Sequence, residues 1–188
     1  MSELLDIVDT DGEPTGEQLD KDVIHRLGLL HRDVHVWVTD GESILEQQRA
    51  WHKKIMPGKW DISVGGHVGA GESYLDAAIR ETEEELGLSL TPERFIPAGR
   101  LETDMVMGSP QEGYWHHRVV GDNFVVVERN LSLSALRLQA SEVVAARLYP
   151  IDQLEADQMR FETARRHAPQ PLALWRLGIA AMRAAAEQ

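Results

Sequence analysis

The chain of 188 residues contains no cysteine. This absence excludes disulfides, thiolate metal sites and a cysteine nucleophile, and it fits a reducing compartment such as the cytoplasm. Long apolar runs are also lacking, since the stretches at 34–38 and 124–127 fall far short of the roughly 20 residues that a membrane helix needs. Basic residues are outnumbered 19 to 31 by acidic ones, which gives a net charge of −12. We therefore expect no membrane partner and no broad attachment to nucleic-acid phosphates.

The remaining composition predicts one soluble globular domain over residues 1–188. Apolar residues make up 43% of the chain and charged residues 27%, which is ordinary for a soluble fold. The length is sufficient for one sizeable core and short for two. Neither end carries a basic segment followed by an apolar run, so no signal or transit peptide is expected. A small ligand delivered with metal ions suits the negative charge better than a polyanion does.

Most of the predicted elements are strands bounded by turn residues. The first is predicted at residues 4–8, before a polar stretch that continues to Lys21. A hairpin is predicted from 34–38 and 43–47, joined at Asp40-Gly41. Further strands are expected at 60–64, ending at Gly65-Gly66, at 98–102, at 117–128 with a break at Gly121-Asp122, and at 143–149.

Helices are predicted at three places among these strands. One covers residues 73–86, a short one follows Pro150, and a terminal one covers about 172–186, which lacks proline and has only Gly178 as a breaker. Because strands dominate and helices interrupt them irregularly, we expect an α/β (α+β) fold with a mixed sheet covered by helices. The apolar side chains of the terminal helix, at Leu172, Trp175, Ile179 and Met182, dock on the core or join a second subunit.

The segment 65–72 is rich in glycine and leads into the helix at 73–86. Four glycines within seven residues allow close backbone approaches that a side chain would block. Ser73 and Asp76 have the spacing of a capping box, which predicts the start of the helix. At 100° per residue, one apolar stripe should face the core; it is formed by Leu75, Ala78, Ile79, Thr82 and Leu86.

The carboxylates of Glu81, Glu84 and Glu85 fall together on another face of this helix. Like charges three and four residues apart disfavour an isolated helix by a few tenths of a kcal/mol per pair, and a bound cation reverses that effect. Oxygen ligands without His or Cys suit Mg²⁺, with Mn²⁺ as a substitute. An arbitrary run of Glu is more often only a solvated helix face, so the flanking residues decide between the two interpretations.

Those flanking residues follow a known motif. Gly66, then Glu72, Arg80-Glu81, Glu84-Glu85 and Gly87-Leu88 together resemble the Nudix box, over residues 66–88. The match includes every charged and glycine position of the motif. Thr82 departs from it, since the family usually has an aliphatic residue there, and this change removes no metal ligand.

The resemblance implies a Nudix fold, with the acidic helix at one sheet edge, and roles for individual residues. Glu84 and Glu85 would be the main metal ligands, with Glu81 assisting and the Gly66 carbonyl completing the set. Arg80 and Glu72 would orient these carboxylates, and Glu83 would be solvated. The general base in this family can lie outside the box; Glu142 is our first candidate and Glu112 a weaker one.

The first half of the chain also resembles isopentenyl-diphosphate isomerase, a branch of the same family. The similar segments are residues 5–9, 30–32 and 57–67. In that isomerase a cysteine stands where this chain has Gly65, and histidines matching His25, His31 and His67 help to hold a metal. Whether these three form a second metal site here stays open. Because Gly65 cannot supply a proton and the box carboxylates are retained, hydrolysis is favoured over isomerisation.

The other histidines and the tryptophans have competing interpretations. For His31 and His35 a hydrogen-bonded, partly buried position is favoured over a metal role. His67 and Gly65 lie beside Gly66, where His67 could donate to a substrate phosphate. Neighbouring residues of a strand face opposite sides, so at most one of His116 and His117 is expected in a site. A core position is favoured over base stacking for each aromatic ring, namely Trp37, Trp51, Trp60 and Trp115.

The expected function is hydrolysis of a small-molecule diphosphate, most generically a nucleoside diphosphate linked to another group. Two alternatives remain: an isomerase-like activity, which the missing cysteine opposes, and an inactive ligand-binding sensor, which the intact carboxylates oppose. The apolar face of the terminal helix allows a homodimer, and neither nucleic acid nor membrane is expected as a partner.

Overall fold

The computed structural model describes residues 3–53, 55–109, 113–158 and 171–187. Its helices are α1 (Lys21–Leu27), α2 (Tyr74–Leu86), α3 (Ile151–Gln158) and α4 (Leu172–Ala186), with 3-10 turns at Pro92–Arg94 and Leu133–Ala135. Its strands are β1 (Leu4–Val8), β2 (Pro14–Asp20), β3 (His31–Thr39), β4 (Ser43–Arg49), β5 (Trp60–Asp61), β6 (Val64–His67), β7 (Ile96–Ser109), β8 (Gly113–Val127) and β9 (Val143–Pro150).

The main sheet is mixed, as the sequence predicts. Its strand order is β5-β4-β3-β8-β7, while β6 pairs with β3 and β9 pairs with β4. Only β3 and β8 are parallel among these pairs; β1 and β2 form a separate antiparallel hairpin. The hairpin expected between β3 and β4 exists at its turn, where Thr39 pairs with Ile44. Beyond the turn, the two strands take other partners: β3 pairs with β6, and β4 pairs with β9.

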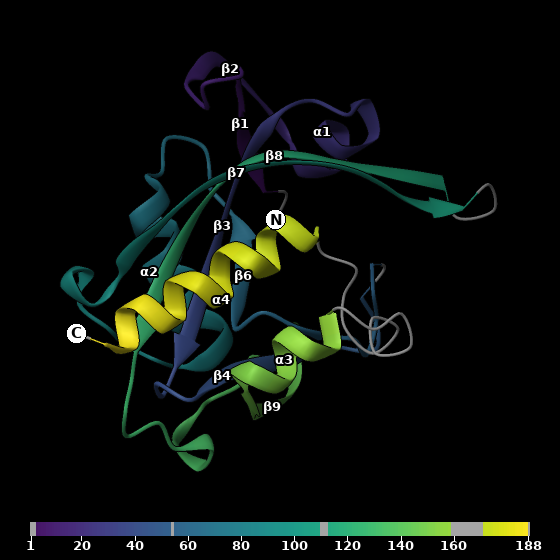
Figure 1. The fold of residues 1–188 in the computed structure, drawn as a ribbon. Coiled ribbons are helices and arrows are strands. Elements are labelled where there is room, and N and C mark those ends of the chain that lie inside the picture. The colour runs from purple at the N-terminus through teal and green to yellow at the C-terminus, as the bar shows by residue number, and fades with distance from the viewer. Residues whose placement is uncertain (1–2, 54, 110–112, 159–170, 188) are drawn as a thin grey trace.

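The central strand β3 is buried along its whole length and separates two cores. Its valines Val34, Val36 and Val38 pack into one core with Ala77 and Leu86 of α2. Trp37, on the opposite face, packs into the other core with side chains of α3 and α4. Figure 1 shows α4 crossing the near face of the sheet, with α2 on its other side. This confirms a mixed sheet between helices.

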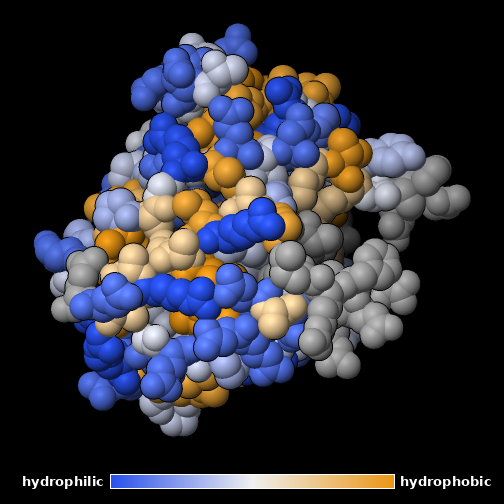
Figure 2. Space-filling model, in the orientation of Figure 1, coloured by the Kyte–Doolittle hydropathy of each residue, from blue (hydrophilic) through white to orange (hydrophobic). Residues whose placement is uncertain are grey.

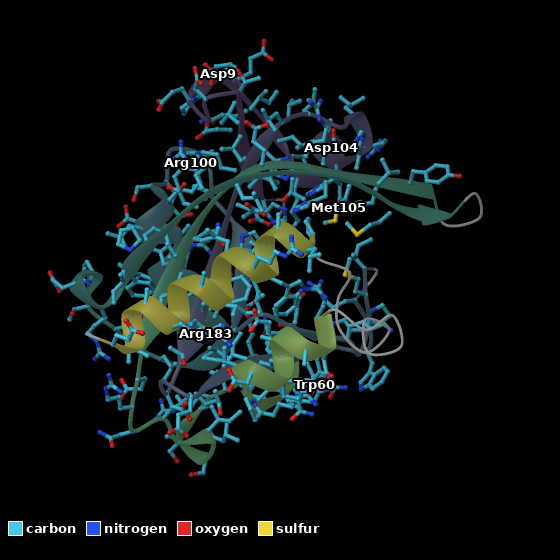
Figure 3. All side chains as sticks on the ribbon, viewed as in Figure 1. Asp9, Trp60, Arg100, Asp104, Met105 and Arg183 are labelled. Carbon is cyan, nitrogen blue, oxygen red and sulfur yellow. The ribbon has the colours of Figure 1, made fainter. Side chains whose placement is uncertain are left out.

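The terminal helix α4 docks on the core of its own chain. Leu174, Trp175, Ile179 and Met182 are buried. Leu172 was expected on this apolar face, but it lies at the first turn and is 40% exposed. On the outer side, Arg183 contacts Asp152 and Glu155 of α3, and the view of this face mixes hydrophilic and hydrophobic residues (Figures 2 and 3). Within the described residues, no helix is both long and apolar enough to cross a membrane.

The prediction of one strand at 60–64 was wrong in two respects, its continuity and the residue at which it ends. The structure has two short strands there, and β6 continues through Gly65 and Gly66 to His67. The two glycines pair with His35 and Val34 of β3. They are therefore strand positions. At Gly66 the missing side chain allows close packing of Glu81, whereas a Cβ at Gly65 would make only ordinary contacts.

The break expected at Gly121-Asp122 was also wrong, because β8 runs without interruption. A Cβ on Gly121 would come within 2.2 Å of the Asp33 carboxylate. This glycine makes room for a buried side chain of the neighbouring strand.

The polar stretch expected to continue to Lys21 instead contains β2, which α1 follows. Helix α1 begins after Asp20, whose side chain accepts from the Asp22 N–H, and ends at Gly28 with φ 65°. Seven residues are too few for an apolar repeat to reveal such a helix. The cap residues were the available signal.

Strands β7 and β8 form a ribbon that extends beyond the sheet. Their pairing reaches Ser109 and Gly113, whereas pairing of β8 with β3 starts only at Val119. Figure 1 shows this ribbon passing α1, and Figure 3 places Asp104 and Met105 on it. The ribbon brings Trp115 and His117 to α1, so that residues far apart in the sequence meet there.

Candidate functional site

The expected site residues gather around one cleft of about 1110 Å³. One wall comes from the loop 65–72 and from α2, a second from α1, β3 and β8, and a third from residues 49–53, 55–56 and 139–142. The expected residues in its lining are Gly65, Gly66, His67, Glu72, Arg80, Glu81, Glu84, Glu85 and Glu142. The structure thus brings together all the site residues that the sequence predicts and that lie within the described part of the chain.

Helix α2 begins as predicted, with the Ser73 side chain accepting from the Asp76 N–H. Its Glu81 carboxyl group packs directly on the backbone of Gly66, where a Cβ would lie 2.3 Å from the carboxyl carbon. Any larger residue at this position would displace Glu81. Glycine is therefore required here for the close approach of strand and helix.

Arg80 holds two of the carboxylates in place. Its guanidinium group donates two hydrogen bonds of 2.8 Å to Glu72 and one of 2.7 Å to Glu81. Glu72 also accepts from the Gly69 N–H at 2.8 Å, which ties the glycine loop to the helix. Hydrogen bonds from Arg80 outweigh the effect of burial and lower the pKa of Glu72. Arg80 also pairs with Glu84, at a longer distance of 3.5 Å.

The three carboxylates of the acidic face differ in their exposure. Glu84 is half exposed, whereas Glu85 is only 5% exposed and accepts a hydrogen bond from Gln47. Burial raises the pKa of Glu81 to about 7, although Arg80 acts against this rise. Burial and the charge of Glu81 raise the pKa of Glu85 well above its usual value. A carboxylate at Glu85 is thus costly in the absence of a cation.

This donor set fits a hard divalent ion. Glu81, Glu84 and Glu85 all line the cleft with Gly66, and the buried Glu85 has one neutral hydrogen-bond donor, Gln47, to offset its charge. Oxygen donors of this kind suit Mg²⁺ or Mn²⁺, which keep waters and share phosphate oxygens with a substrate.

Two further positions of α2 clarify the expected pattern. Thr82 is fully buried, and its hydroxyl donates to the Ala78 carbonyl at 2.6 Å, so the departure from an aliphatic residue leaves no polar group unsatisfied. Glu83 is exposed and accepts from the Ser89 hydroxyl, away from the cleft lining. A substitution at Glu83 is therefore a matched control for the same substitution at Glu84 or Glu85.

The third wall holds basic residues that the sequence did not reveal. Arg49, His52 and Lys53 line the cleft, and Lys53 pairs with Glu142 at 2.5 Å across 89 positions of sequence. No local motif surrounds them, so only the tertiary structure shows their position. Glu112, the weaker candidate for a base, lies outside the described residues.

A second cluster consists of four histidines, His25, His31, His67 and His117, whose ligand atoms lie within 4.8 Å of one another. Each comes from a different element: α1, β3, β6 and β8 in that order. The interpretation of His31 as a hydrogen-bonded, buried residue holds for one nitrogen, since its Nδ1 donates to the Leu29 carbonyl. Its Nε2 is buried with no hydrogen-bond partner among the described residues.

Burial lowers the pKa of three imidazoles of this cluster. Burial, with the charge of His31, lowers the pKa of His25 to about 3. Burial lowers the pKa of His31 to about 4 and that of His67 well below its usual value. Neutral imidazole is the form that ligates metal ions.

The remaining histidines and tryptophans separate as expected from their strand positions. His116 is on the outer side and pairs with Asp104, while His117 joins the cluster. His35 lies beside Asp33, which also contacts His117.

The tryptophans occupy different environments. Trp37 is a core residue, but Trp115 stacks on His25 in the cleft. Arg147 lies over Trp60, and Trp51 is exposed. The preference for a core position is therefore wrong for Trp115 and Trp51.

A family model described as the NUDIX domain matches residues 29–170. The chain is 34% identical over 154 residues to Nudix hydrolase 3 of Arabidopsis thaliana, an alignment that covers 80% of this chain and 20% of that protein. It is 31% identical over 156 residues to an uncharacterized Nudix hydrolase of Clostridium acetobutylicum, with 81% and 72% covered.

A relative named isopentenyl-diphosphate Delta-isomerase, from Serratia proteamaculans, is 42% identical over 90 residues. That alignment covers 47% of this chain and 50% of the relative. The chain therefore spans about half of this relative and a fifth of the Arabidopsis protein.

Among solved structures, the fold is similar to that of DR0079 from Deinococcus radiodurans, with a TM-score of 0.68 at 22% identity. The match covers 95% of this chain and 99% of that one. The MutT protein of Methanosarcina mazei gives a TM-score of 0.56 at 18% identity, with 83% and 95% covered. The fold, the box and the family model agree, and the chain belongs to the Nudix family of hydrolases.

Proposed function

We propose that this protein hydrolyses a diphosphate linkage in a small molecule, most generically a nucleoside diphosphate joined to another group, with Mg²⁺ or Mn²⁺. The observation that carries the proposal is the buried Glu85 carboxylate beside Glu81 and Glu84, in a cleft with a basic opposite wall. Such an arrangement suits a cation and an anionic substrate between the two walls.

The residues of the chain have separate tasks in this proposal. Glu81, Glu84, Glu85 and the Gly66 carbonyl would hold the ion, which when bound neutralises phosphate charge and lowers the pKa of a water. Arg80 and Glu72 fix the carboxylates, and Arg49 with Lys53 would bind phosphate oxygens from the facing wall. The volume of about 1110 Å³ leaves room for a nucleoside and its second group.

Hydrolysis needs a base, and Glu142 is the candidate we propose. A water oxygen forms a bond to one phosphorus while the bridging P–O bond breaks. The base takes the proton of the water, and the leaving phosphate ends with the electron pair of the broken bond. Glu142 lines the same cleft and is held in place by its contact with Lys53.

Isomerisation of an isoprenoid diphosphate is the second candidate, favoured by the half-length similarity to the Serratia enzyme. It requires a proton donor at the position of Gly65, and glycine has none. A ligand-binding sensor without activity is the third candidate, which the full set of carboxylates opposes. We propose the cytoplasm as the compartment and no nucleic-acid or membrane partner; a homodimer is not required by the cleft.

The experiment is product analysis of a panel of diphosphate compounds, with isopentenyl diphosphate included, in Mg²⁺ or Mn²⁺. Glu84→Gln and the matched control Glu83→Gln are assayed in parallel. Metal-dependent cleavage that is lost in Glu84→Gln and kept in Glu83→Gln supports the proposal. Conversion of isopentenyl diphosphate without cleavage supports the isomerase, and binding without turnover supports the sensor.

A further inference from the structure

The β1–β2 hairpin contacts the glycine-rich loop that leads into α2. The Ala70 N–H donates to the Leu4 carbonyl at 3.0 Å, and Leu5 forms an antiparallel bridge with Gly69. Part of the loop is thus paired with β1, although neither strand of the hairpin belongs to the motif at 66–88. The role of this pairing requires an explanation of its own.

Asp6 connects the hairpin to the loop through its side chain. One carboxylate oxygen, Oδ2, accepts from the Gly71 N–H at 2.8 Å and from Nη2 of Arg32 at 2.8 Å. The other oxygen accepts from Nε2 of Gln18 at 2.9 Å. Because Asp6 is 5% exposed and Arg32 is 7% exposed, these charge-assisted bonds lie in the interior, where they are stronger than at the surface.

From Gly71 the contacts lead to the carboxylates of α2 through Glu72. The Glu72 carboxylate accepts from the Gly69 N–H and from Arg80. Arg80 in turn donates to Glu81. The loop therefore fixes one side of Glu72 while Arg80 fixes the other, and a displaced loop would disturb the partners of Arg80.

The ion pair with Asp6 also keeps the charge of Arg32 from competing for Glu72. Although burial acts to raise it, the pKa of Glu72 is lowered first by hydrogen bonds from Arg80, and the charge of Arg32 acts in the same direction. Arg32 is thus close enough to attract Glu72. Because Asp6 neutralises Arg32, Arg80 remains the cation that orients Glu72.

The hairpin reaches the beginning of α2 as well. The guanidinium group of Arg32 lies over the ring of Tyr74, the first residue of α2, at 5.4 Å. Arg100 lies over the same ring at 4.9 Å and donates to the Asp11 carbonyl in the hairpin turn at 3.1 Å. The hairpin therefore holds the acidic helix both through the loop and at its first turn.

We propose that Asp6 is a positioning residue for the carboxylate cluster of α2, because it holds the loop at Gly71 and pairs with Arg32. Glu72 and Arg80 then keep the geometry in which the cluster binds a divalent ion. Asp6 does not line the cleft, so it acts through other residues. This inference rests on the metal site of the proposed function, and it makes the N-terminal hairpin part of the working site.

The test is titration of two variants and the wild type with Mn²⁺ alone, without substrate, measured from the EPR signal of the free ion. Asp6→Leu combined with Arg32→Met removes both charges, because a lone buried charge destabilises a fold more than an apolar pair of similar size does. We expect this double variant to bind Mn²⁺ roughly 3–10-fold more weakly. Gln18→Met is the matched control, because it removes a bond to the same carboxylate and leaves Gly71 and Arg32 in contact with it.

Kinetics on a cleaved compound give a readout that a merely structural role would not move. In the double variant the Mg²⁺ concentration for half-maximal activity should rise by the same factor as the Mn²⁺ dissociation constant. The KM for the substrate at saturating Mg²⁺ should stay unchanged.

Amide hydrogen exchange in the wild type covers the case in which the double variant does not fold. Because coupling between two sites is reciprocal, Mg²⁺ should slow exchange of the Ala70 and Gly71 amides, which donate to β1. The amides of Asp11 and Glu13, which donate to the Asp9 side chain in the hairpin turn, are the control and should not change.

The proposal is overturned if the folded double variant binds Mn²⁺ as the wild type does, or if Gln18→Met weakens binding equally. It is also overturned if the wild type binds no Mn²⁺, or if Mg²⁺ leaves exchange at Ala70 and Gly71 unchanged. Mn²⁺ binding that weakens in the double variant, with no compound cleaved by the wild type, would contradict the hydrolysis and support this inference. Cleavage by a double variant that equals the wild type would do the reverse.

Discussion

The first and second walls of the cleft are built in different ways. The carboxylates of Glu81, Glu84 and Glu85 belong to one helix, and their relative positions follow from the helical repeat. The four imidazoles come from one helix and three strands, and they meet because the sheet and the β7–β8 ribbon bring those elements together. The first cluster is thus a property of a segment, and the second is a property of the whole fold.

The comparison shows which contacts each cluster depends on. Both are held by a positioning residue, Arg80 on one side and Asp33 on the other. Both also depend on a glycine within a strand, because Gly66 accommodates Glu81 and Gly121 accommodates Asp33. Substitutions at matched positions should therefore separate the two clusters.

The largest effect should come from Glu85→Gln. The substitution keeps the shape of the buried side chain and removes one charge from the carboxylate cluster of α2. We expect kcat to fall more than about 100-fold, since even positioning partners of metal ligands cost roughly 10–100-fold. Steady-state kinetics on a cleaved compound give the result. Equal loss of kcat in Glu83→Gln would contradict the separation of helix faces.

Asp33→Asn should affect the histidine cluster. The amide still reaches His117 but carries no negative charge to hold its Nε2–H. Although burial acts to raise it, the pKa of Asp33 is lowered by its neighbours His35 and His117. The carboxylate therefore stabilises the folded protein above its ordinary pKa, and this stabilisation is lost as the pH falls. We expect the variant to lose roughly 1–3 kcal/mol of unfolding free energy at pH 7, as measured by urea unfolding, and the difference should shrink on acidification. A loss that stays constant with pH would contradict this role of the carboxylate.

Arg80→Lys is the corresponding change on α2. Lysine keeps the charge but cannot donate to Glu72 and Glu81 in the planar arrangement of a guanidinium group. We expect kcat to fall about 10-fold, at the lower end of the range for such partners. The Mg²⁺ concentration for half-maximal activity should rise as well. An unchanged metal dependence would indicate that Arg80 contacts substrate instead of positioning the carboxylates.

The smallest effect concerns stability. Because Glu85 is 5% exposed and its hydrogen bond comes from a neutral amide, its charge destabilises the metal-free protein. Glu85→Gln should raise the free energy of unfolding by about 1 kcal/mol without metal. Urea unfolding in the presence of a chelator measures this difference. Added Mg²⁺ should stabilise the wild type more than the variant, and a destabilised variant would contradict the assignment of Glu85.

The sequence predicted which residues of 66–88 meet in the lining of the cleft, because they belong to one loop and one helical repeat. It predicted α2, α4, β1 and β9 for the same reason: local pattern and caps sufficed. It could not place Lys53 beside Glu142, or His117 beside Asp33, since sheet pairing decides those contacts. Glycines led to wrong strand boundaries: Gly65, Gly66 and Gly121 were interpreted as a stop or a break, but all three lie within strands, and Gly66 and Gly121 make room for neighbouring side chains.

The parallel pairing of β3 and β8 determines how the histidine cluster responds when β8 loses a residue. Side chains of a strand alternate between faces, so a shift by one residue exchanges them. His116 and His117 stand side by side just before Val119, where the pairing with β3 begins. Deletion of Arg118 would turn His117 outward and bring His116 to the face of the cluster. The doubled histidine thus keeps an imidazole in the cluster when one residue is lost at the end of the ladder.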